Sequence, residues 1–334
     1  MTVTRTEDTL WQRVPGRSAW QRTAVRSAAV VVPIVLVGLF LFRQWPLIDS
    51  SAGRLSTADR DWLAAAAFAA FMTWVCSATA LQGAVVEKLP PLLLLASQFA
   101  ASAANHVLPA GVGGNAVSLR FLIRRGLTPT RSVTSLAVRS GAAVLARFVL
   151  LTTVLLMFPT ALHFHRLAPG GLVMPGRPLL IAGVAAALVV FALLLPRCAR
   201  LLRSRLRGFL MSVACDLRAL HRDRVRVAGL WGGSVAFPMM HASVMIAVIR
   251  AVHAPVPVSG VLVAYLFAST AAGWLPTPAG LGSLDAALGL ALVTAGASAV
   301  AATSAVLGYR LFTAWLPLIP GVLVLAALVK RREL

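Results

Sequence analysis

Residues 108–114 read LPAGVGG and residues 275–282 read LPTPAGLG, and each stretch lies inside a long apolar region. Proline removes a backbone N–H and glycine weakens a helix, so each cluster interrupts the helix that the apolar residues would otherwise form. In lipid, such a break leaves backbone groups unpaired, which is tolerated where they line a polar cavity. The alternative is that these residues only kink helices for packing. Because the break occurs twice, we favour a functional role.

The composition predicts an all-α polytopic membrane protein. Of the 334 residues, 59% are hydrophobic and only 12% are charged, and the mean hydropathy is +0.84. A soluble domain of this length cannot hide so much apolar surface. The net charge of +21 resides in short Arg-rich segments between apolar runs, which is typical of loops beside anionic lipids and argues against a nucleic-acid partner. The three cysteines have no paired spacing, so we expect no disulfide framework, metal site or cofactor.

Hydropathy predicts about six full spans and two regions between them that contain the breaks. Residues 1–26 are expected to form a basic cytoplasmic tail, 27–329 a single integral membrane domain, and 330–334 a cytoplasmic end. The first apolar run is interpreted as an uncleaved span rather than a signal peptide. The predicted spans are 27–42, 62–84, 131–158, 178–195, 227–250 and 298–329, and the interrupted regions are 89–123 and 257–295.

Arginine placement predicts that the two interrupted regions open on opposite faces of the membrane. Both ends of region 89–123 carry basic residues and are expected in the cytoplasm, whereas region 257–295 starts and ends outside. The second arm of the first region would be only about 20 Å long as a helix, so a re-entrant hairpin is expected. Two short spans would also place both ends of this region on the same side of the membrane, and this alternative stays open. Segment 197–226 is expected to be an amphipathic surface helix, with a solvated basic loop as the alternative.

The order span, span, hairpin, span therefore occurs twice with opposite orientation. PAGVGGNAVSL (109–119) aligns with PAGLGSLDAAL (278–288). We predict two inverted repeats, 27–158 and 178–329, with the broken helices near the middle of the membrane, as in many transporters.

The candidate substrate-binding residues lie at and after the two breaks. Half-helices beginning near Gly111 and Gly280 would aim their N-termini at the middle of the membrane, and their partial positive charge suits a phosphate. Arginine within a span is costly and faces a cavity or a partner. Asp285 is expected to pair with Arg310, and a purely structural ion pair is the alternative. The candidates are Asn105, Gly111, Gly113, Gly114, Arg139, Pro278, Gly280, Gly282, Asp285 and Arg310.

Other residues are interpreted structurally. His106 either lines the cavity or is a satisfied buried histidine, and His241 is expected to hydrogen-bond a neighbouring helix. The Gly229–Gly233 pair is expected to permit close helix packing. The sequence contains no nucleophile–base pair, metal-binding helix motif or phosphate-binding loop, so we expect no catalytic site.

Three motifs together resemble a known family. They are N-x-x-L-P-A-G-x-G-G at 105–114, L-P-T-P-A-G-L-G-S-L-D-A-A-L at 275–288 and Y-R-L-F-T-A-W-L-P-L at 309–318. From about residue 25 to 329, the chain is similar to the transmembrane region of lysylphosphatidylglycerol synthases. Members commonly have Glu where this chain has Asp285, which keeps the charge but shortens its reach. In the full-length synthases, the resemblance implies, this region flips aminoacylated phospholipid, while a separate cytosolic domain makes the lipid. Because few residues follow the last predicted span, we expect no synthase domain and no lipid aminoacylation.

The sequence therefore predicts a flippase-like transporter in the cytoplasmic (inner) membrane, with both termini in the cytoplasm. Its partner would be a phospholipid with an anionic or zwitterionic headgroup, or a polyprenyl-phosphate-linked lipid. Two alternatives stay open: an accessory scaffold bound to an envelope-synthesis enzyme, and a lipid-modifying membrane enzyme, which is disfavoured. The sequence does not indicate the oligomeric state.

Overall fold

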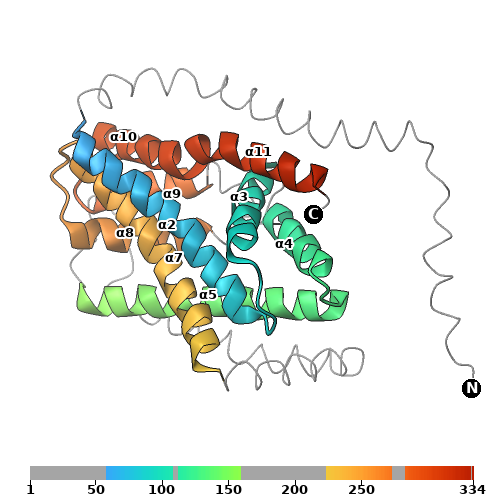
Figure 1. Ribbon diagram of the computed structural model, residues 1–334. Helices are drawn as coiled ribbons and strands as arrows, with labels where there is room; N and C mark the ends of the chain where they lie inside the picture. The colour runs from blue at the N-terminus through green and yellow to red at the C-terminus, as the bar shows by residue number, and fades with distance from the viewer. Residues whose placement is uncertain (1–57, 108–111, 159–222, 273–282, 332) are drawn as a thin grey trace, which may run out of the picture. The chain divides into compact units, whose positions relative to one another are not determined.

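The computed structural model describes residues 58–107, 112–158, 223–272, 283–331 and 333–334. The chain divides into Met1–Pro46 and Leu47–Leu334, and every described residue belongs to the second unit. All regular structure in the described ranges is helical (Figure 1). The elements are α2 (Arg60–Ala84), α3 (Pro91–Val107), α4 (Val112–Arg124), α5 (Pro129–Met157), α7 (Arg224–Ala251), α8 (Val258–Ala272), α9 (Ser283–Thr294), α10 (Ala299–Arg310), η2 (Leu311–Trp315) and α11 (Leu316–Lys330).

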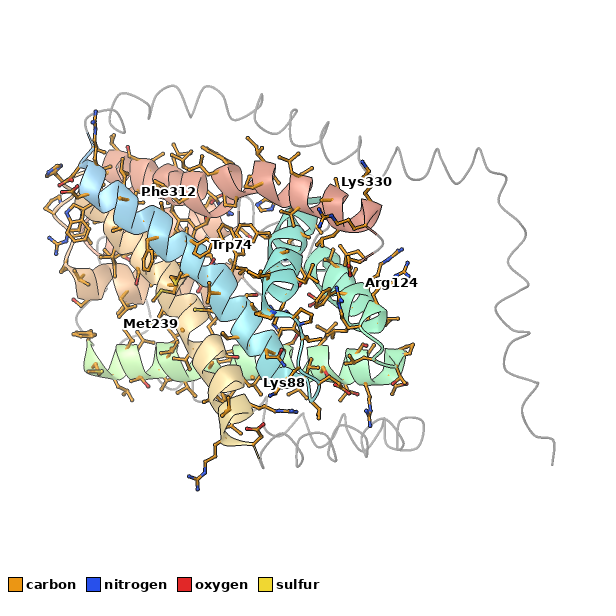
Figure 2. All side chains as sticks on the ribbon, viewed as in Figure 1. Trp74, Lys88, Arg124, Met239, Phe312 and Lys330 are labelled. Carbon is orange, nitrogen blue, oxygen red and sulfur yellow. The ribbon has the colours of Figure 1, made fainter. Side chains whose placement is uncertain are left out.

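The described helices are those of a multi-pass membrane protein. Helices α2, α5 and α7 and the continuous helical run Ala299–Lys330 are long and apolar enough to cross a membrane. They confirm the predicted spans 62–84, 131–158, 227–250 and 298–329. Carbon-only side chains project outward from these helices, as lipid contact requires (Figure 2). The predicted spans 27–42 and 178–195 lie outside the described residues. Segment 197–226 also lies outside them, except for residues 223–226, which form the N-terminal end of α7.

Helices α2 and α7 pack side by side and antiparallel because glycines let their backbones approach. A Cβ atom on Gly83 would lie 2.2 Å from the Leu230 nitrogen, and one on Gly233 would lie 2.6 Å from the Cys76 oxygen. Neither separation is possible for a real side chain. The close packing predicted for the Gly229–Gly233 pair is therefore confirmed, with Gly233 making the tighter contact.

Both interrupted regions form pairs of short helices. Helix α3 packs along α4, and α8 packs along α9. The second arms, α4 and α9, have 13 and 12 residues. At 1.5 Å per residue they are about 20 and 18 Å long, shorter than the roughly 30 Å apolar core of a bilayer. The described parts of α4 and α9 begin at Val112 and Ser283, and the helix starts expected near Gly111 and Gly280 lie outside the described residues.

The two pairs begin at opposite ends of the α2–α7 pair. The first follows the end of α2, where Gly83 meets Leu230 near the start of α7. The second follows the end of α7, where the Asp59 N–H donates to the Ala251 oxygen at 3.1 Å beside the start of α2. Each pair also packs on a long helix of the other half, α3 on α11 and α8 on α5.

The same turn connects each second arm to the following long helix. Gly126 after α4 and Gly296 after α9 have positive φ values of 90° and 110°. In each turn, the N–H of the residue after the glycine donates to the carbonyl five residues earlier, at 3.2 and 2.9 Å. This is the glycine C-cap that satisfies the last helical carbonyls. The Thr128 and Ser298 side chains then cap the N-termini of α5 and α10.

The last predicted span contains an interruption that the sequence analysis did not predict. Between α10 and α11, η2 forms a turn of π-helix in which the Leu316 N–H donates to the Leu311 oxygen. Pro317 and Pro320 follow directly. Since proline supplies no N–H, carbonyls of the preceding turns lose their intrahelical partners.

Candidate functional site

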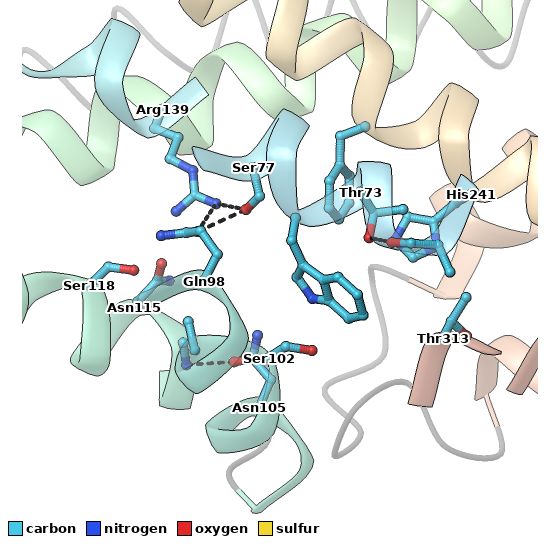
Figure 3. A pocket seen from close by; sticks show the side chains of 15 residues that line it. Thr73, Ser77, Gln98, Ser102, Asn105, Asn115, Ser118, Arg139, His241 and Thr313 are labelled. Atoms are coloured by element: carbon cyan, nitrogen blue, oxygen red, sulfur yellow. Dashed lines mark hydrogen bonds between the residues drawn. The ribbon is translucent and has the colours of Figure 1, made fainter. Parts of the chain in front are cut away.

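A polar cavity of about 250 Å³ lies among the described helices (Figure 3). At roughly 30 Å³ for each water, this space holds about eight waters, so it fits a small polar group and not a pair of acyl chains. Helices α2, α3, α4, α5 and α7 and the turn η2 all contribute to the wall. The lining residues are Ala70, Thr73, Trp74, Ser77, Gln98, Ala101, Ser102, Asn105, Gly114, Asn115, Ser118, Arg139, Phe237, His241 and Thr313.

Arg139 is the cationic residue of this wall, and neutral groups hold its guanidinium in place. Its Nη2 donates to the Ser77 Oγ at 2.7 Å and to the Gln98 Oε1 at 3.4 Å. The Ser77 hydroxyl donates in turn to the same Gln98 oxygen at 2.9 Å. Figure 3 shows these three side chains pointing toward one another. The Nε and Nη1 donors of Arg139 have no acceptor among the described residues.

No carboxylate neutralises Arg139 within the described part of the chain. The ion pairs there join Arg125 to Glu333, Arg131 to Glu87, Arg226 to Asp223 and Arg310 to Asp285. An arginine at the centre of a spanning helix costs about 3 kcal/mol on insertion scales. Hydrogen bonds from neutral groups fix the position of Arg139 without removing its charge.

Asn105 joins the two arms of the first helix pair. Its Oδ1 accepts from the Gly114 N–H at 2.6 Å, so the side chain at the end of α3 caps the start of α4. A Cβ on Gly114 would lie 2.7 Å from the Asn105 amide nitrogen, and one on Gly113 would lie 2.1 Å from the Ala104 oxygen. These glycines therefore permit close approach of the two arms. The sequence predicted that these glycines expose backbone N–H groups; instead, the Gly114 N–H donates to the Asn105 side chain.

Several uncharged polar groups face the cavity with hydrogen-bonding capacity to spare. The buried Ser118 hydroxyl has no hydrogen-bond partner in the described structure. Across the residues that the structure covers, the Ser102 hydroxyl and the Asn115 amide make no side-chain hydrogen bonds either. Figure 3 shows Ser118 and Asn115 on the side of the cavity nearest Arg139. A ligand bearing hydroxyl groups would satisfy them.

His241 in the cavity wall contacts two buried tyrosines that are not themselves lining residues. The Tyr309 hydroxyl and the His241 Nδ1 are 3.0 Å apart, which confirms the hydrogen bond predicted between His241 and a neighbouring helix. The His241 ring also stacks on Tyr265, with centroids 6.1 Å apart. His106, by contrast, is not a lining residue, and its Nδ1 lies 2.8 Å from the Ser102 backbone oxygen.

Asp285 and Arg310 form the predicted ion pair, with 2.5 Å between the Asp285 Oδ1 and the Arg310 Nε. Arg310 is only 5% exposed. Neither residue lines the cavity, so the structure does not bring Arg310 to the wall that contains Arg139. Tyr309 and Thr313, on either side of Arg310 in sequence, connect the same helix to that wall.

The predicted site residues thus fall into three groups. Asn105, Gly114 and Arg139 line one cavity, with Gly113 packed behind it. Asp285 and Arg310 pair with each other outside the lining. The remaining candidates, Gly111, Pro278, Gly280 and Gly282, lie outside the described residues.

Most residues of the polar wall were not predicted from the sequence, although their helical spacing marks them. On α2, α3 and α4 the polar residues recur three or four positions apart, which places them on one face of each helix. They are Thr73 and Ser77 on α2, Gln98, Ser102 and Asn105 on α3, and Asn115 and Ser118 on α4.

No curated protein matches the chain. The family model described as the lysylphosphatidylglycerol synthase TM region matches residues 25–321, which is most of the chain. The protein, with its multi-pass apolar helices and interrupted motifs, therefore belongs to the family of the lysylphosphatidylglycerol synthase transmembrane region.

Proposed function

We propose that this protein carries the headgroup of a phospholipid, or of a polyprenyl-phosphate-linked lipid, across the cytoplasmic membrane. The observation that carries the proposal is the polar cavity containing Arg139, which is enclosed by apolar helices and has no carboxylate partner for this arginine in the described structure. A charged group in such a place is expensive unless it serves a ligand. The proposal assigns the protein no chemical step.

Arg139 would bind the phosphate of the lipid. A guanidinium presents a planar set of N–H donors that can bind phosphate bidentately, which an ammonium cannot do. Ser77 and Gln98 occupy Nη2, so the other donors stay available to the ligand. The start of α4, which reaches the cavity at Gly114, adds partial positive charge. The acyl chains would remain in the bilayer while the headgroup occupies the cavity.

We propose further that the two halves are inverted repeats and that each helix pair is re-entrant. Three observations support this: the matching glycine turns at Gly126 and Gly296, the opposite ends at which the pairs begin, and the short second arms. The end of α2 and the start of α5 would be cytoplasmic, because the basic residues at the helix ends concentrate there. These are Lys88, Arg120, Arg124, Arg125, Arg131, Arg224, Arg226, Lys330 and Arg331.

Thiol labelling tests this orientation. In a background without native cysteines, a cysteine replacing the exposed Ala299 should react with an impermeant maleimide added outside intact cells. A cysteine replacing the exposed Thr130 should react only after the cells are opened. Labelling of Thr130→Cys from outside would refute the inverted arrangement.

Lipid movement is tested with purified protein in vesicles that contain phosphatidylglycerol labelled with a fluorophore on one acyl chain. Dithionite quenches the fluorophore of lipids in the outer leaflet at once, so the slow phase of quenching measures the movement of labelled lipid from the inner to the outer leaflet. Arg139→Gln should slow it about 10- to 100-fold, because a hydrogen bond to a charged group contributes about 1.5–3 kcal/mol. Arg139→Lys should retain an intermediate rate.

Arg131→Gln is the matched control. It changes the same residue type on the same helix, but Arg131 is 61% exposed and pairs with Glu87 at 3.5 Å outside the cavity. Its transport rate should equal that of the wild type. Equal rates for the wild type and Arg139→Gln, at equal amounts of reconstituted protein, would disprove the role assigned to the cavity.

A further inference from the structure

The side of the cavity away from Arg139 also contains a polar side chain, that of His241. We infer that His241 is a second ligand-binding residue: its Nε2–H, held in place by Tyr309, donates to an oxygen that the lipid headgroup carries beyond its phosphate. Such an oxygen belongs to a hydroxyl or to an ester carbonyl, as in a headgroup built on glycerol or on a sugar. The inference rests on the proposed function and names a specificity-determining residue for it.

Arg139 and His241 reach the cavity from different helices and lie at opposite sides of it (Figure 3). On α2, Ser77 accepts from the Arg139 Nη2 at 2.7 Å, and Thr73 lines the cavity at the His241 side. These two residues are four positions apart, which is about 6 Å along a helix. A phosphate bound to Arg139 therefore leaves His241 to contact the part of the headgroup that follows the phosphate.

The hydrogen bond to Tyr309 determines which nitrogen of His241 carries the proton. The Tyr309 hydroxyl and the His241 Nδ1 are 3.0 Å apart. A phenol O–H is a stronger acid than the N–H of neutral imidazole, and an imidazole nitrogen is a stronger base than a phenol oxygen. The hydroxyl therefore donates to Nδ1. The proton of the neutral ring then resides on Nε2, which becomes a hydrogen-bond donor.

Aromatic neighbours hold the His241 ring in one orientation. Tyr265 stacks on it with an angle of 10° between the ring planes, and Phe237 packs against it at 68° with centroids 4.7 Å apart. Because Tyr309 uses Nδ1, the Nε2 on the other edge of the ring is the polar atom that His241 offers to the cavity it lines.

Tyr309 is a positioning residue, because it fixes His241 without lining the cavity. It is only 2% exposed, and its ring centroid lies 6.0 Å from those of both His241 and Tyr265. The next residue, Arg310, pairs with Asp285 of α9, which fixes this end of α10. The second helix pair thus helps to set the orientation of a donor in the cavity wall.

Competition between two lipids of equal charge tests the inference. Dioleoyl phosphatidylglycerol and dioleoyl phosphatidylpropanol share the phosphodiester and the length of the headgroup, but phosphatidylpropanol carries no oxygen beyond the phosphate. The purified protein is incubated with equal amounts of both, and native mass spectrometry measures the ratio of the retained lipids. Wild-type protein should retain phosphatidylglycerol over phosphatidylpropanol by about tenfold, the effect of one well-placed hydrogen bond. A ratio near one would overturn the inference.

Two substitutions of His241 separate the donor from the ring. His241→Gln keeps an N–H near the position of Nε2, so its ratio should stay above about threefold. His241→Phe keeps a ring and removes the donor, so its ratio should fall to about one. Because this variant leaves the buried Tyr309 hydroxyl without its partner, His241→Phe/Tyr309→Phe repeats the test with both polar groups removed. A tenfold ratio in the double variant would contradict the assignment.

Tyr309→Phe tests the positioning role, because it removes only the hydroxyl that fixes the proton on Nε2. The ratio should fall by about threefold. A purely structural Tyr309 would change thermal stability and leave the ratio at the wild-type value, since both lipids compete for the same folded protein. His106→Phe is the matched control, because His106 contacts the Ser102 oxygen and does not line the cavity. Its ratio should equal that of the wild type, and a fall as large as that in His241→Phe would refute a specific role for His241.

A further arm identifies the lipid source. Undecaprenyl phosphoglucose replaces phosphatidylglycerol in the same competition. Retention that falls in His241→Phe supports the inference for whichever lipid shows it and names the carrier, whereas retention of both lipids that is independent of His241 overturns it.

The proposed function fails by a different measurement. Arg139→Gln should lower the retention of phosphatidylglycerol and phosphatidylpropanol together and leave their ratio unchanged, because both contain the phosphodiester. Unchanged total retention in Arg139→Gln would refute the phosphate site alone. A ratio that does not depend on His241 would refute the role of His241 alone.

Discussion

Replacing Gly113 by alanine should separate the two arms of the first helix pair. The new Cβ would lie 2.1 Å from the Ala104 oxygen, whereas ordinary contacts begin at 3.4 Å. The obstacle is backbone, so no side-chain rotation relieves it. The arms must move apart by about 1.3 Å at this point, the difference between these two distances. The adjacent 2.6 Å hydrogen bond from the Gly114 N–H to Asn105 would then stretch beyond its range.

The expected loss of stability follows from three terms. Overpacking a well-packed contact costs about 1–3 kcal/mol. A buried N–H that loses its partner costs about 1–3 kcal/mol more. Alanine recovers about 1 kcal/mol over glycine in a helix. The free energy of unfolding should therefore fall by about 3 kcal/mol, within a range of roughly 1 to 5.

Thermal unfolding in detergent, followed by intrinsic tryptophan fluorescence, measures this effect. Gly141→Ala is the matched control: Gly141 lies in helix α5 and a Cβ there would meet nothing within 4 Å. This variant should unfold at or slightly above the wild-type temperature. Lipid movement should fall in Gly113→Ala, because the Asn105 side of the cavity shifts with the helix. A Gly113→Ala protein with wild-type stability and transport would refute close packing as the reason for this glycine.

Three further changes test other contacts by the same unfolding measurement. Asn105→Ala should cost about 1 kcal/mol, the usual value of a lost helix cap, while Asn105→Asp should keep the cap; equal stability of the two would remove the capping role. Gly233→Ala should destabilise the α2–α7 contact. The control is Gly232→Ala, which should not, because a Cβ there would meet nothing within 4 Å. Equal effects of the two variants would refute the role of Gly233 in helix packing. Asp285→Asn should cost about 3–5 kcal/mol by removing the carboxylate that pairs with the buried Arg310, Arg310→Gln should cost less because Asp285 is 30% exposed, and the double variant should regain stability. Full recovery of transport in that double variant would show that Arg310 has no role in binding.

The sequence predicted much of the helical framework because apolar length is a strong signal. Spans predicted at 62–84, 131–158 and 227–250 are observed at 60–84, 129–157 and 224–251. The Gly-Pro clusters located both short-helix pairs. The sequence did not predict η2, because a π-helical turn depends on the packing around it and has no fixed residue pattern.

The site was harder to predict than the fold. Arg139 was recognised because a charge within a span has few structural uses. Its partners Ser77 and Gln98 were not predicted. These helices are apolar on nearly every side, so no hydrophobic stripe in the sequence indicates which face of each helix points inward. Which candidate residues line one wall depends on the rotation of each helix, which packing decides. The first glycine break lies beside the cavity, and the tertiary contacts supplied a different reason for Gly113.

The π-turn and prolines between α10 and α11 have a mechanical consequence. A helix bends most easily where carbonyls lack intrahelical partners, and η2 with Pro317 and Pro320 creates such a point beside Thr313 in the cavity wall. On one side of it, α10 packs against α9 and α7; on the other, α11 packs against α3. A hinge there would let the first helix pair tilt with α11 while the second stays with α10. We therefore expect η2 to be the pivot about which the two helix pairs tilt relative to one another, which would change the width of the cavity between them.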